Sequence, residues 1–318
     1  MKYFILPCIA LGLTACAQVR PGSDVSFDHP ITPSLTQPIP ARTPLTSMVI
    51  DTEQLPARPS AVGSGRTVFS GPTATMNNFE SHITTVNPGQ AAHAPHTHGN
   101  DEMLIMKEGT LQVIFKDHTY IATPGSVMYY SSLDPHGTFN TGTTPATYYV
   151  FSWVTDKTPS SPSTPVVPGA PAVAAAGPIT PSLMQALPKG TKLTSTVFDT
   201  TKIPVETSAA GMKRGLFDGP TATLKNFEGH ITTVPPGQAA HTPPPHGAEE
   251  LILVTEGTFK VTLKDQTYLA GPGTYIFYAP NEPHGIINVG KTNASYYVFI
   301  FTTDKTQPSS APTTPAKS

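Results

Sequence analysis

Apolar and polar residues alternate with a period of two along short stretches of this chain. Residues 111–116, LQVIFK, place an apolar side chain at every second position, and residues 259–264, FKVTLK, repeat the pattern. A period of two puts alternate side chains on one face of a β-strand. Lys116-Asp117 and Lys264-Asp265 mark hairpin turns after these strands. Many short strands without a convincing helix predict an all-β jelly roll or barrel.

Long segments of the chain return at a fixed distance of 148 positions. ITPSL stands at residues 31–35 and 179–183, and GPTAT stands at 71–75 and 219–223. Over the whole repeat, roughly 70 of 128 aligned positions are identical, without an insertion. This is the duplication of a complete domain rather than a short solenoid repeat. It predicts two domains, residues 31–158 and residues 179–306.

The segments outside the two copies have a different composition. Residues 159–178 are rich in Pro, Ala and Ser and show no apolar periodicity, which predicts an extended linker. Residues 307–318 are similar and are expected to be a disordered tail. Residues 16–30 are expected to be a tether that carries the folded part away from a membrane surface.

The N-terminus has the pattern of an export signal. Residues 1–15 contain Lys2, an apolar stretch and then small residues, and the stretch is too short to span a membrane. Leu13-Thr14-Ala15-Cys16 resembles a bacterial lipobox, which implies lipidation of Cys16 and a lipid-anchored protein of the cell envelope or periplasm. An ordinary cleaved signal peptide is the alternative. Either way Cys8 leaves with the signal, so no internal disulfide is expected.

Composition excludes one class of partner. Charged residues make up 13% of the chain and the formal net charge is −2, against about 25% charged residues in typical soluble domains. The sequence has no basic stripe and no run of Lys or Arg. Nucleic-acid binding is therefore not expected, and membrane contact is expected only through the N-terminal lipid.

Residues 89–109, GQAAHAPHTHGNDEMLIMKEG, contain a candidate metal site. His96 and His98 are two residues apart, so on a strand both imidazoles would face the same side. A Gly-Asn turn then brings Glu102 to the start of the next strand, and His136 follows further along the chain. Three imidazoles and one carboxylate suit Mn, Fe, Ni, Zn or Cu. We expect one divalent transition metal in each occupied barrel.

These residues also resemble the cupin superfamily. Its first motif is met by His96-x-His98, three residues, Glu102, six residues and Gly109, although Gly89 precedes His96 by one residue more than usual. Its second motif is matched by Gly125, His136 and Asn140, with Ser131 and Leu133 in place of the expected Pro and Gly. The resemblance implies two tandem cupin domains, each a double-stranded β-helix or jelly-roll barrel, so that the chain is a bicupin.

The second copy keeps most of the candidate ligands. His98, Glu102 and His136 return as His246, Glu250 and His284, whereas His96 becomes Pro244, which cannot bind a metal. Copy two therefore offers three ligands with open coordination positions. The alternative interpretation is a weak or vacant site with a structural role. His241 is a possible substitute ligand, although the run Pro243-Pro244-Pro245 holds its approach extended.

Other residues recur at the same offset. His82 and His230 lie in Glu-x-His-Ile-Thr-Thr strands, where a buried, hydrogen-bonded imidazole is favoured. His93 and His241 are interpreted as hydrogen-bonded loop residues, or alternatively as residues that line the barrel mouth. For Arg66 and Arg214 the favoured interpretation is an ion pair at the surface or at the end of a barrel. Holding an anionic substrate is the alternative.

The sequence favours an enzyme over a binding protein. It has no Gly-x-Ser-x-Gly elbow, no His-Glu-x-x-His and no Walker loop. The cupin resemblance implies a metal-dependent dioxygenase, decarboxylase, oxidase, lyase or isomerase, with the main site in copy one and Glu102 as ligand or proton carrier. A duplicated cupin resembles the oxalate decarboxylase and quercetin dioxygenase arrangements. The alternatives are a lipoprotein that binds a metal or small ligand without turnover, and a structural envelope module. Either a monomer or a homo-oligomer is compatible with the sequence.

Overall fold

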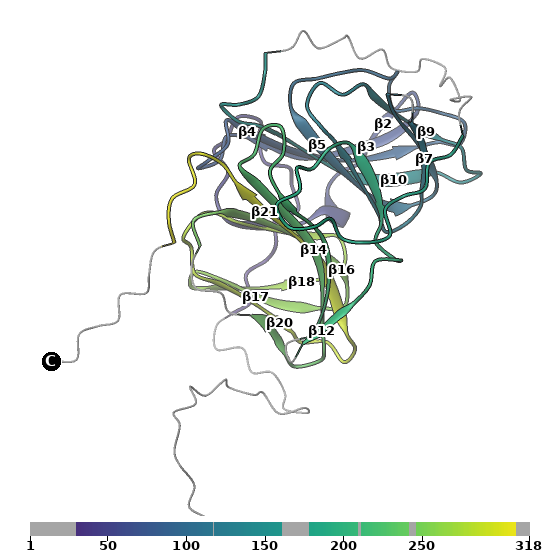
Figure 1. Cartoon of the computed structure of the whole chain (residues 1–318). Coiled ribbons are helices and arrows are strands. Elements are labelled where there is room, and N and C mark those ends of the chain that lie inside the picture. The colour runs from purple at the N-terminus through teal and green to yellow at the C-terminus, as the bar shows by residue number, and fades with distance from the viewer. Residues whose placement is uncertain (1–29, 117, 161–177, 209–210, 242–245, 310–318) are drawn as a thin grey trace, which may run out of the picture.

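The computed structural model in Figure 1 describes residues 30–116, 118–160, 178–208, 211–241 and 246–309. In these residues it contains 21 strands and one three-residue 3₁₀ helix, η1 (Thr52–Gln54). The prediction of an all-β chain is confirmed. No helix in the described part is long and apolar enough to cross a bilayer.

The strands of the first copy alternate with short turns. They are β1 (Met48–Asp51), β2 (Arg58–Ser60), β3 (Gly63–Gly71), β4 (Asn78–Val86), β5 (Asp101–Glu108), β6 (Leu111–Phe115), β7 (His118–Ala122), β8 (Ser126–Tyr130), β9 (His136–Asn140) and β10 (Ala146–Val154).

The strands of the second copy follow almost the same plan. They are β11 (Thr196–Asp199), β12 (Glu206–Ser208), β13 (Gly211–Gly219), β14 (Asn226–Val234), β15 (Ala239–His241), β16 (Glu249–Glu256), β17 (Phe259–Leu263), β18 (Gln266–Ala270), β19 (Thr274–Tyr278), β20 (His284–Asn288) and β21 (Ala294–Thr302). The one addition is β15, which pairs with β20.

Each copy forms a large sheet and a small sheet. The large sheets have the orders β11-β8-β5-β10-β4-β3-β2 and β1-β19-β16-β21-β14-β13-β12. The small sheets have the orders β7-β6-β9 and β15-β20-β17-β18. All the strand pairs within these sheets are antiparallel. In Figure 1 the two copies form two neighbouring barrels.

The two copies exchange their first strands. β1 pairs with β19 of the second copy, with Met48 opposite Phe277, and β11 pairs with β8 of the first copy, with Thr196 opposite Tyr129. Strand pairing therefore crosses the predicted boundaries between the copies. The repeat offset locates each copy, but it does not say which copy's sheet a strand joins.

Side chains next to the exchanged strands fasten them in place. The Thr52 hydroxyl donates to Gly273 O at 2.6 Å, and the Thr200 hydroxyl makes the matching bond to Gly125 O at 2.5 Å. Ser47 and Ser195 accept backbone hydrogen bonds from Ala279 and Ser131. The exchange is reciprocal in its side chains as well as in its strands.

One continuous hydrophobic core joins the two barrels. Phe79 of β4 lies 5.2 Å, centroid to centroid, from Phe301 of β21, and Trp153 of β10 lies 5.0 Å from Phe227 of β14. All four rings are fully buried. Aromatic side chains bury 150–250 Å² each, so this contact contributes strongly to the stability of the pair. Each barrel also has a smaller core of its own.

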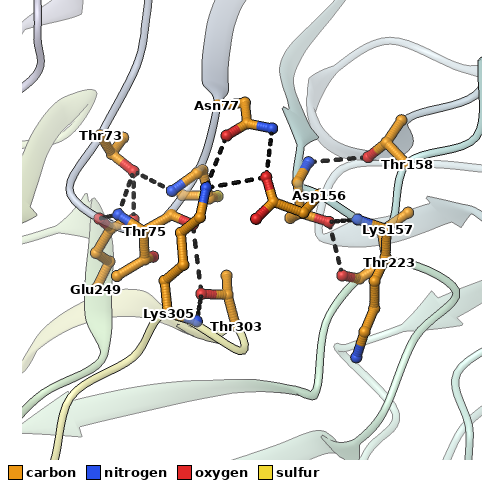
Figure 2. Close-up of polar contacts among 12 residues, drawn as sticks. Thr73, Thr75, Asn77, Asp156, Lys157, Thr158, Thr223, Glu249, Thr303 and Lys305 are labelled. Atoms are coloured by element: carbon orange, nitrogen blue, oxygen red, sulfur yellow. Dashed lines mark hydrogen bonds and ion pairs between the residues drawn. The ribbon is translucent and has the colours of Figure 1, made fainter.

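Two buried carboxylates also connect the barrels. Glu249, at the start of β16, accepts hydrogen bonds from Thr73 Oγ1 and from the backbone N–H of Thr75, both at 2.9 Å (Figure 2). Lys305 donates to Asn77 and Asp156 at the same junction. Thr73 and Thr75 belong to the repeated GPTAT segment, so the turn of one copy holds the carboxylate of the other.

The counterpart of Glu249 is Asp101, at the start of β5. Its Oδ2 accepts from Thr221 Oγ1 at 2.7 Å, from Thr223 Oγ1 at 2.7 Å and from Thr223 N at 3.2 Å. Its Oδ1 accepts from Ser132 N at 2.8 Å. Asp101 and Glu249 are both 0% exposed. A buried carboxylate needs several donors to offset its desolvation, and the GPTAT turns supply them.

Candidate metal centres

His96 does not lie on a regular strand. Residues 97–100 and 91–95 have no strand structure, and His96 forms only an isolated bridge with His136. Each of these two residues donates its backbone N–H to the other's carbonyl oxygen, both at 3.0 Å. The predicted strand is wrong because Pro95 lacks an N–H for a ladder and Gly99-Asn100 turns the chain soon afterwards. The bridge still brings His96 to the site.

The structure brings the three candidate histidines of the first copy together and places Glu102 against two of them. Ligand atoms of His96, His98 and His136 lie within 4.8 Å of one another. Glu102, the second residue of β5, places Oε2 at 2.8 Å from His98 Nε2 and at 3.6 Å from His136 Nε2. The loop, β5 and the start of β9 thus converge on one point.

Backbone carbonyls orient the imidazoles. Nδ1 of His98 lies 2.9 Å from Asn100 O, and Nδ1 of His136 lies 2.8 Å from Asp134 O. Since a carbonyl only accepts, each Nδ1 carries a hydrogen and each Nε2 points to the cluster. His136 Nε2 is buried and has no hydrogen-bond partner among the described residues. A buried imidazole nitrogen that has no hydrogen-bond partner and lies beside a carboxylate is suited to bind a transition metal.

The pKa values follow from burial and from Glu102. Burial, with the neighbouring histidines, lowers the pKa of His96 to about 4, so its imidazole is neutral at pH 7. Burial opposes charge on His98, but the hydrogen bond to Glu102, the negative charge of Glu102 and the Asn100 carbonyl together outweigh burial and raise the pKa of His98. For Glu102, burial alone would raise the pKa, yet the nearby imidazoles of His136 and His98 hold it well below its usual value. A proton between His98 and Glu102 therefore competes with a metal.

A strained turn holds His98 in place. Leu133 has φ of 65° and donates its N–H to His98 O at 2.8 Å. It occupies the position where the cupin motif has glycine, and it adopts the left-handed conformation that glycine favours. Asn281, its counterpart, has φ of 59° and donates to His246 O at 2.8 Å. The turn shape is thus kept in both copies without glycine.

The second copy assembles its three predicted ligands in the same manner. Ligand atoms of His246, Glu250 and His284 lie within 4.8 Å of one another. Glu250 Oε2 is 2.9 Å from His246 Nε2 and 3.7 Å from His284 Nε2. Ala248 O and Glu282 O accept from the two Nδ1 atoms. The hydrogen bond to Glu250 raises the pKa of His246. Pro244 lies outside the described residues, and so does the side chain of His241.

The first centre opens into a cavity of about 310 Å³. Its walls include His93, whose ring centroid is 4.2 Å from that of His96, and the pair Glu80–His82. His93 also contacts Ala94 O at 3.2 Å, so it is both a hydrogen-bonded loop residue and a wall residue. The side chain of His82 contacts Glu80 at 3.2 Å as a hydrogen-bonded imidazole, but it is 38% exposed because it lines the cavity, so the prediction of burial is wrong in this copy. His230 is buried as predicted.

A tyrosine at each centre was not found from the sequence. Tyr130 stacks on His136 with centroids 4.3 Å apart, and Tyr278 stacks on His284 at 4.0 Å. Both hydroxyls are buried without a hydrogen-bond partner among the described residues, and burial raises both pKa values. The signal was available, because Tyr130 is one of the identical positions of the repeat.

Comparison with known protein families finds the cupin domain twice in this chain, at residues 82–152 and at residues 230–301. The first range contains His96, His98, Glu102 and His136, and the second contains His246, Glu250 and His284, so all seven candidate ligands lie inside the matched segments. The chain carries two cupin domains in tandem and is a bicupin. No curated protein sequence matches it.

Solved structures with a similar fold match this chain at low sequence identity. The oxalate decarboxylase formate complex of Lactobacillus farciminis matches with a TM-score of 0.60 and 15% identity, over 85% of this chain and 89% of that one. The SENS161-164DSSN mutant of Bacillus subtilis oxalate decarboxylase OxdC gives 0.56 and 14%, over 90% and 87%. AerE from Microcystis aeruginosa gives 0.52 and 11%, over 77% and 96%. At these identities the likeness shows the fold alone.

Proposed function

We propose that this protein is a metal-dependent enzyme that acts on a small oxygen-rich molecule in the cavity of its first barrel. The observation that carries the proposal is the convergence of three imidazoles and Glu102 at the wall of a 310 Å³ cavity. A site that only stapled the barrel would need no such cavity. The reaction belongs to the dioxygenase, decarboxylase, lyase or isomerase types, and the second centre has a supporting role.

The chain's own residues supply binding and proton transfer. A divalent metal held by His96, His98, Glu102 and His136 supplies a Lewis acid that polarises substrate oxygens. Glu102 is the residue we assign to proton transfer, at its Oε2 atom, because it is the carboxylate of the cluster, it lines the cavity and its low pKa keeps it ionised and able to accept a proton. Leu104, Val150 and Tyr148 contribute apolar wall that limits the access of water.

The charge of the cavity favours hydroxyl-bearing substrates. Its described lining contains Glu80 and Glu102 but no Lys or Arg. An organic dianion would therefore meet two carboxylates and have only the metal to offset its charge. Hydroxyl groups can instead donate to these carboxylates. This supports a neutral or weakly charged polyol or phenol rather than a small dicarboxylate.

Location is a proposal from the sequence alone. The Leu13-Thr14-Ala15-Cys16 motif supports export and lipid attachment at Cys16, and these residues lie outside those that the structure describes. A non-catalytic lipoprotein that binds a metal or a small ligand shares this location and is the alternative function.

Metal stripping and a matched pair of variants test the proposal. The purified chain is analysed for Mn, Fe, Ni, Cu and Zn and then assayed with polyols and phenols for O₂ uptake, CO₂ release and isomer formation. We expect turnover to be lost on chelation, restored by one metal, abolished in His98→Ala and retained in His246→Ala. Turnover that survives chelation or His98→Ala would overturn the proposal. Bound metal and ligand without turnover would favour the alternative.

A further inference from the structure

A second cavity, of about 750 Å³, lies between the two barrels. It shares no lining residue with the cavity at the first metal centre and contains no ligand of the second centre. Tyr149 and Tyr297, which are counterparts in the repeat, both line it. Because successive strand residues point to opposite faces, Tyr149 faces this cavity while its neighbours Tyr148 and Val150 face the metal cavity.

One wall of this interbarrel cavity is a row of side chains across the second large sheet. Arg214 of β13 is opposite Ile231 of β14, Ile231 is opposite Tyr297 of β21, and Tyr297 is opposite Leu253 of β16. All four line the cavity. The row presents one guanidinium group at the end of an apolar and aromatic surface.

Arg214 is the cation of the cavity that has no carboxylate partner. The other cation, Lys107, donates to both carboxylate oxygens of Glu53, at 2.6 and 2.7 Å. Glu256 also lines the cavity, but it is exposed and accepts from the Ser295 hydroxyl. Among the described residues Arg214 forms no ion pair, and its Nε is buried without a hydrogen-bond partner. The predicted ion pair of Arg214 is thus not found.

The first copy shows how this arginine is satisfied without a ligand. Arg66, the counterpart of Arg214, donates its Nε–H to Leu55 O at 3.1 Å and does not line the cavity. The arginine at this position of the repeat therefore has a backbone acceptor for its Nε–H in the first copy and no acceptor among the described residues in the second. A buried guanidinium N–H without an acceptor is costly, so an acceptor is expected opposite Arg214.

We propose that the interbarrel cavity binds an organic acid, with its carboxylate on Arg214 and its apolar body against Ile231, Leu253 and the two tyrosines. A guanidinium group matches a carboxylate in geometry and charge. The volume lies within the 300–1,000 Å³ typical of small-molecule sites. The site is separate from the metal chemistry and takes a different class of ligand.

Calorimetry with 2-naphthoate tests this site, and 2-naphthamide serves as the uncharged probe. We expect saturable binding of one naphthoate per chain, both before and after chelation of metal. Arg214→Gln weakens naphthoate binding about ten- to a hundredfold, as loss of a charge-assisted hydrogen bond predicts. The matched control Arg66→Gln leaves the affinity unchanged. The amide binds more weakly than the acid and equally in both variants.

A cavity-filling variant guards against a folding defect in Arg214→Gln. Met212 lies at the cavity wall and is half-buried, and Met212→Trp should block naphthoate while circular dichroism stays unchanged. The proposal is overturned if naphthoate does not saturate, if Arg66→Gln and Arg214→Gln lose affinity equally, or if the amide binds as tightly as the acid. Since metal-free protein is used in parallel, failure here leaves the proposed metal-dependent activity untouched.

Discussion

The two metal centres share a scaffold and differ in one ligand. In both copies backbone carbonyls hold the Nδ1 atoms of the two shared histidines, His98 and His136 or His246 and His284. A tyrosine stacks on the histidine that starts β9 or β20, and a left-handed residue donates to the carbonyl of His98 or His246. The fourth ligand, His96, lies in a loop that makes one bridge, and the second copy has proline there. The ligands retained in both copies are those with matching hydrogen bonds to the scaffold, whereas the ligand that changed is attached through a single backbone bridge.

The largest expected effect comes from making the first centre like the second. His96→Pro removes an imidazole and the N–H that bonds to His136 O. Loss of an outer-shell partner alone costs 10–100-fold in metal affinity, so loss of a ligand should cost at least about a hundredfold. Competitive titration with a chelator measures this, and His29→Pro in the predicted tether is the control. An unchanged affinity would show that the first centre does not use His96.

The buried carboxylates at the junction are the next test. Asp101→Asn places donors where Thr221 and Thr223 need an acceptor, and should destabilise the protein by about 3 kcal/mol. Glu249→Gln should cost about 1–2 kcal/mol, since Glu249 accepts fewer bonds. Urea unfolding measures both. Equal losses would mean that the number of donors does not decide the effect.

Acid stability should differ between Glu228 and its counterpart Glu80. The His230 imidazole, with Nδ1 3.2 Å from Glu228 Oε1, and the Lys213 ammonium lower the pKa of Glu228 to about 2. A lowered folded-state pKa gives stability that is present above pH 4.5 and lost as the pH falls towards 2. Glu228→Gln should cost roughly 1–2 kcal/mol at pH 7, after allowance for solvent screening, and much less at pH 2.5.

The control for this pH effect is Glu80→Gln, because the Glu80–His82 pair is more exposed. Exposed pairs contribute about 0–1 kcal/mol, so the control should change little at either pH. Urea midpoints of the variants are compared with wild type at each pH. A constant difference between wild type and Glu228→Gln across this range would contradict the assignment.

The smallest expected effect concerns the two left-handed turn residues. Leu133→Gly relieves the steric cost of a branched residue at φ of 65° and should stabilise the protein by about 1 kcal/mol, since Leu133 is 47% exposed and loses little packing. Asn281→Gly should change stability by only a few tenths, because Asn tolerates this conformation. Thermal unfolding compares the two. A larger gain at Asn281 would reverse this ranking.

Sequence spacing predicted what is local within one copy. His98 and Glu102 are four residues apart across one turn, and the structure places them 2.8 Å apart. The strand assigned to His96 was wrong because Pro95 has no backbone N–H to join a sheet, and the spacing of two histidines in so short a segment is not enough to predict a strand. The turn of the second motif kept its shape although Leu133 is not glycine, since surrounding hydrogen bonds impose it.

Contacts between the copies were not predictable from the repeat. The offset of 148 is the same whether β1 joins its own barrel or the other, so the exchange leaves no mark in the sequence. The sequence also does not show which GPTAT turn binds Asp101, because this segment occurs in both copies; the structure shows that it is the turn of the second copy. Arg66 and Arg214 have identical places in the pattern, and only the structure separates the satisfied arginine from the open one.

The exchange of first strands makes the two halves inseparable. A fragment ending in the linker would carry β1 without β19 to receive it, and it would leave the edge of β8 bare because β11 is gone. Exposed edges recruit other chains, so an isolated half would find its missing strand only on a second molecule. Because both barrels belong to one chain, their pairing does not depend on protein concentration, whereas two single-barrel chains would have to associate as a dimer.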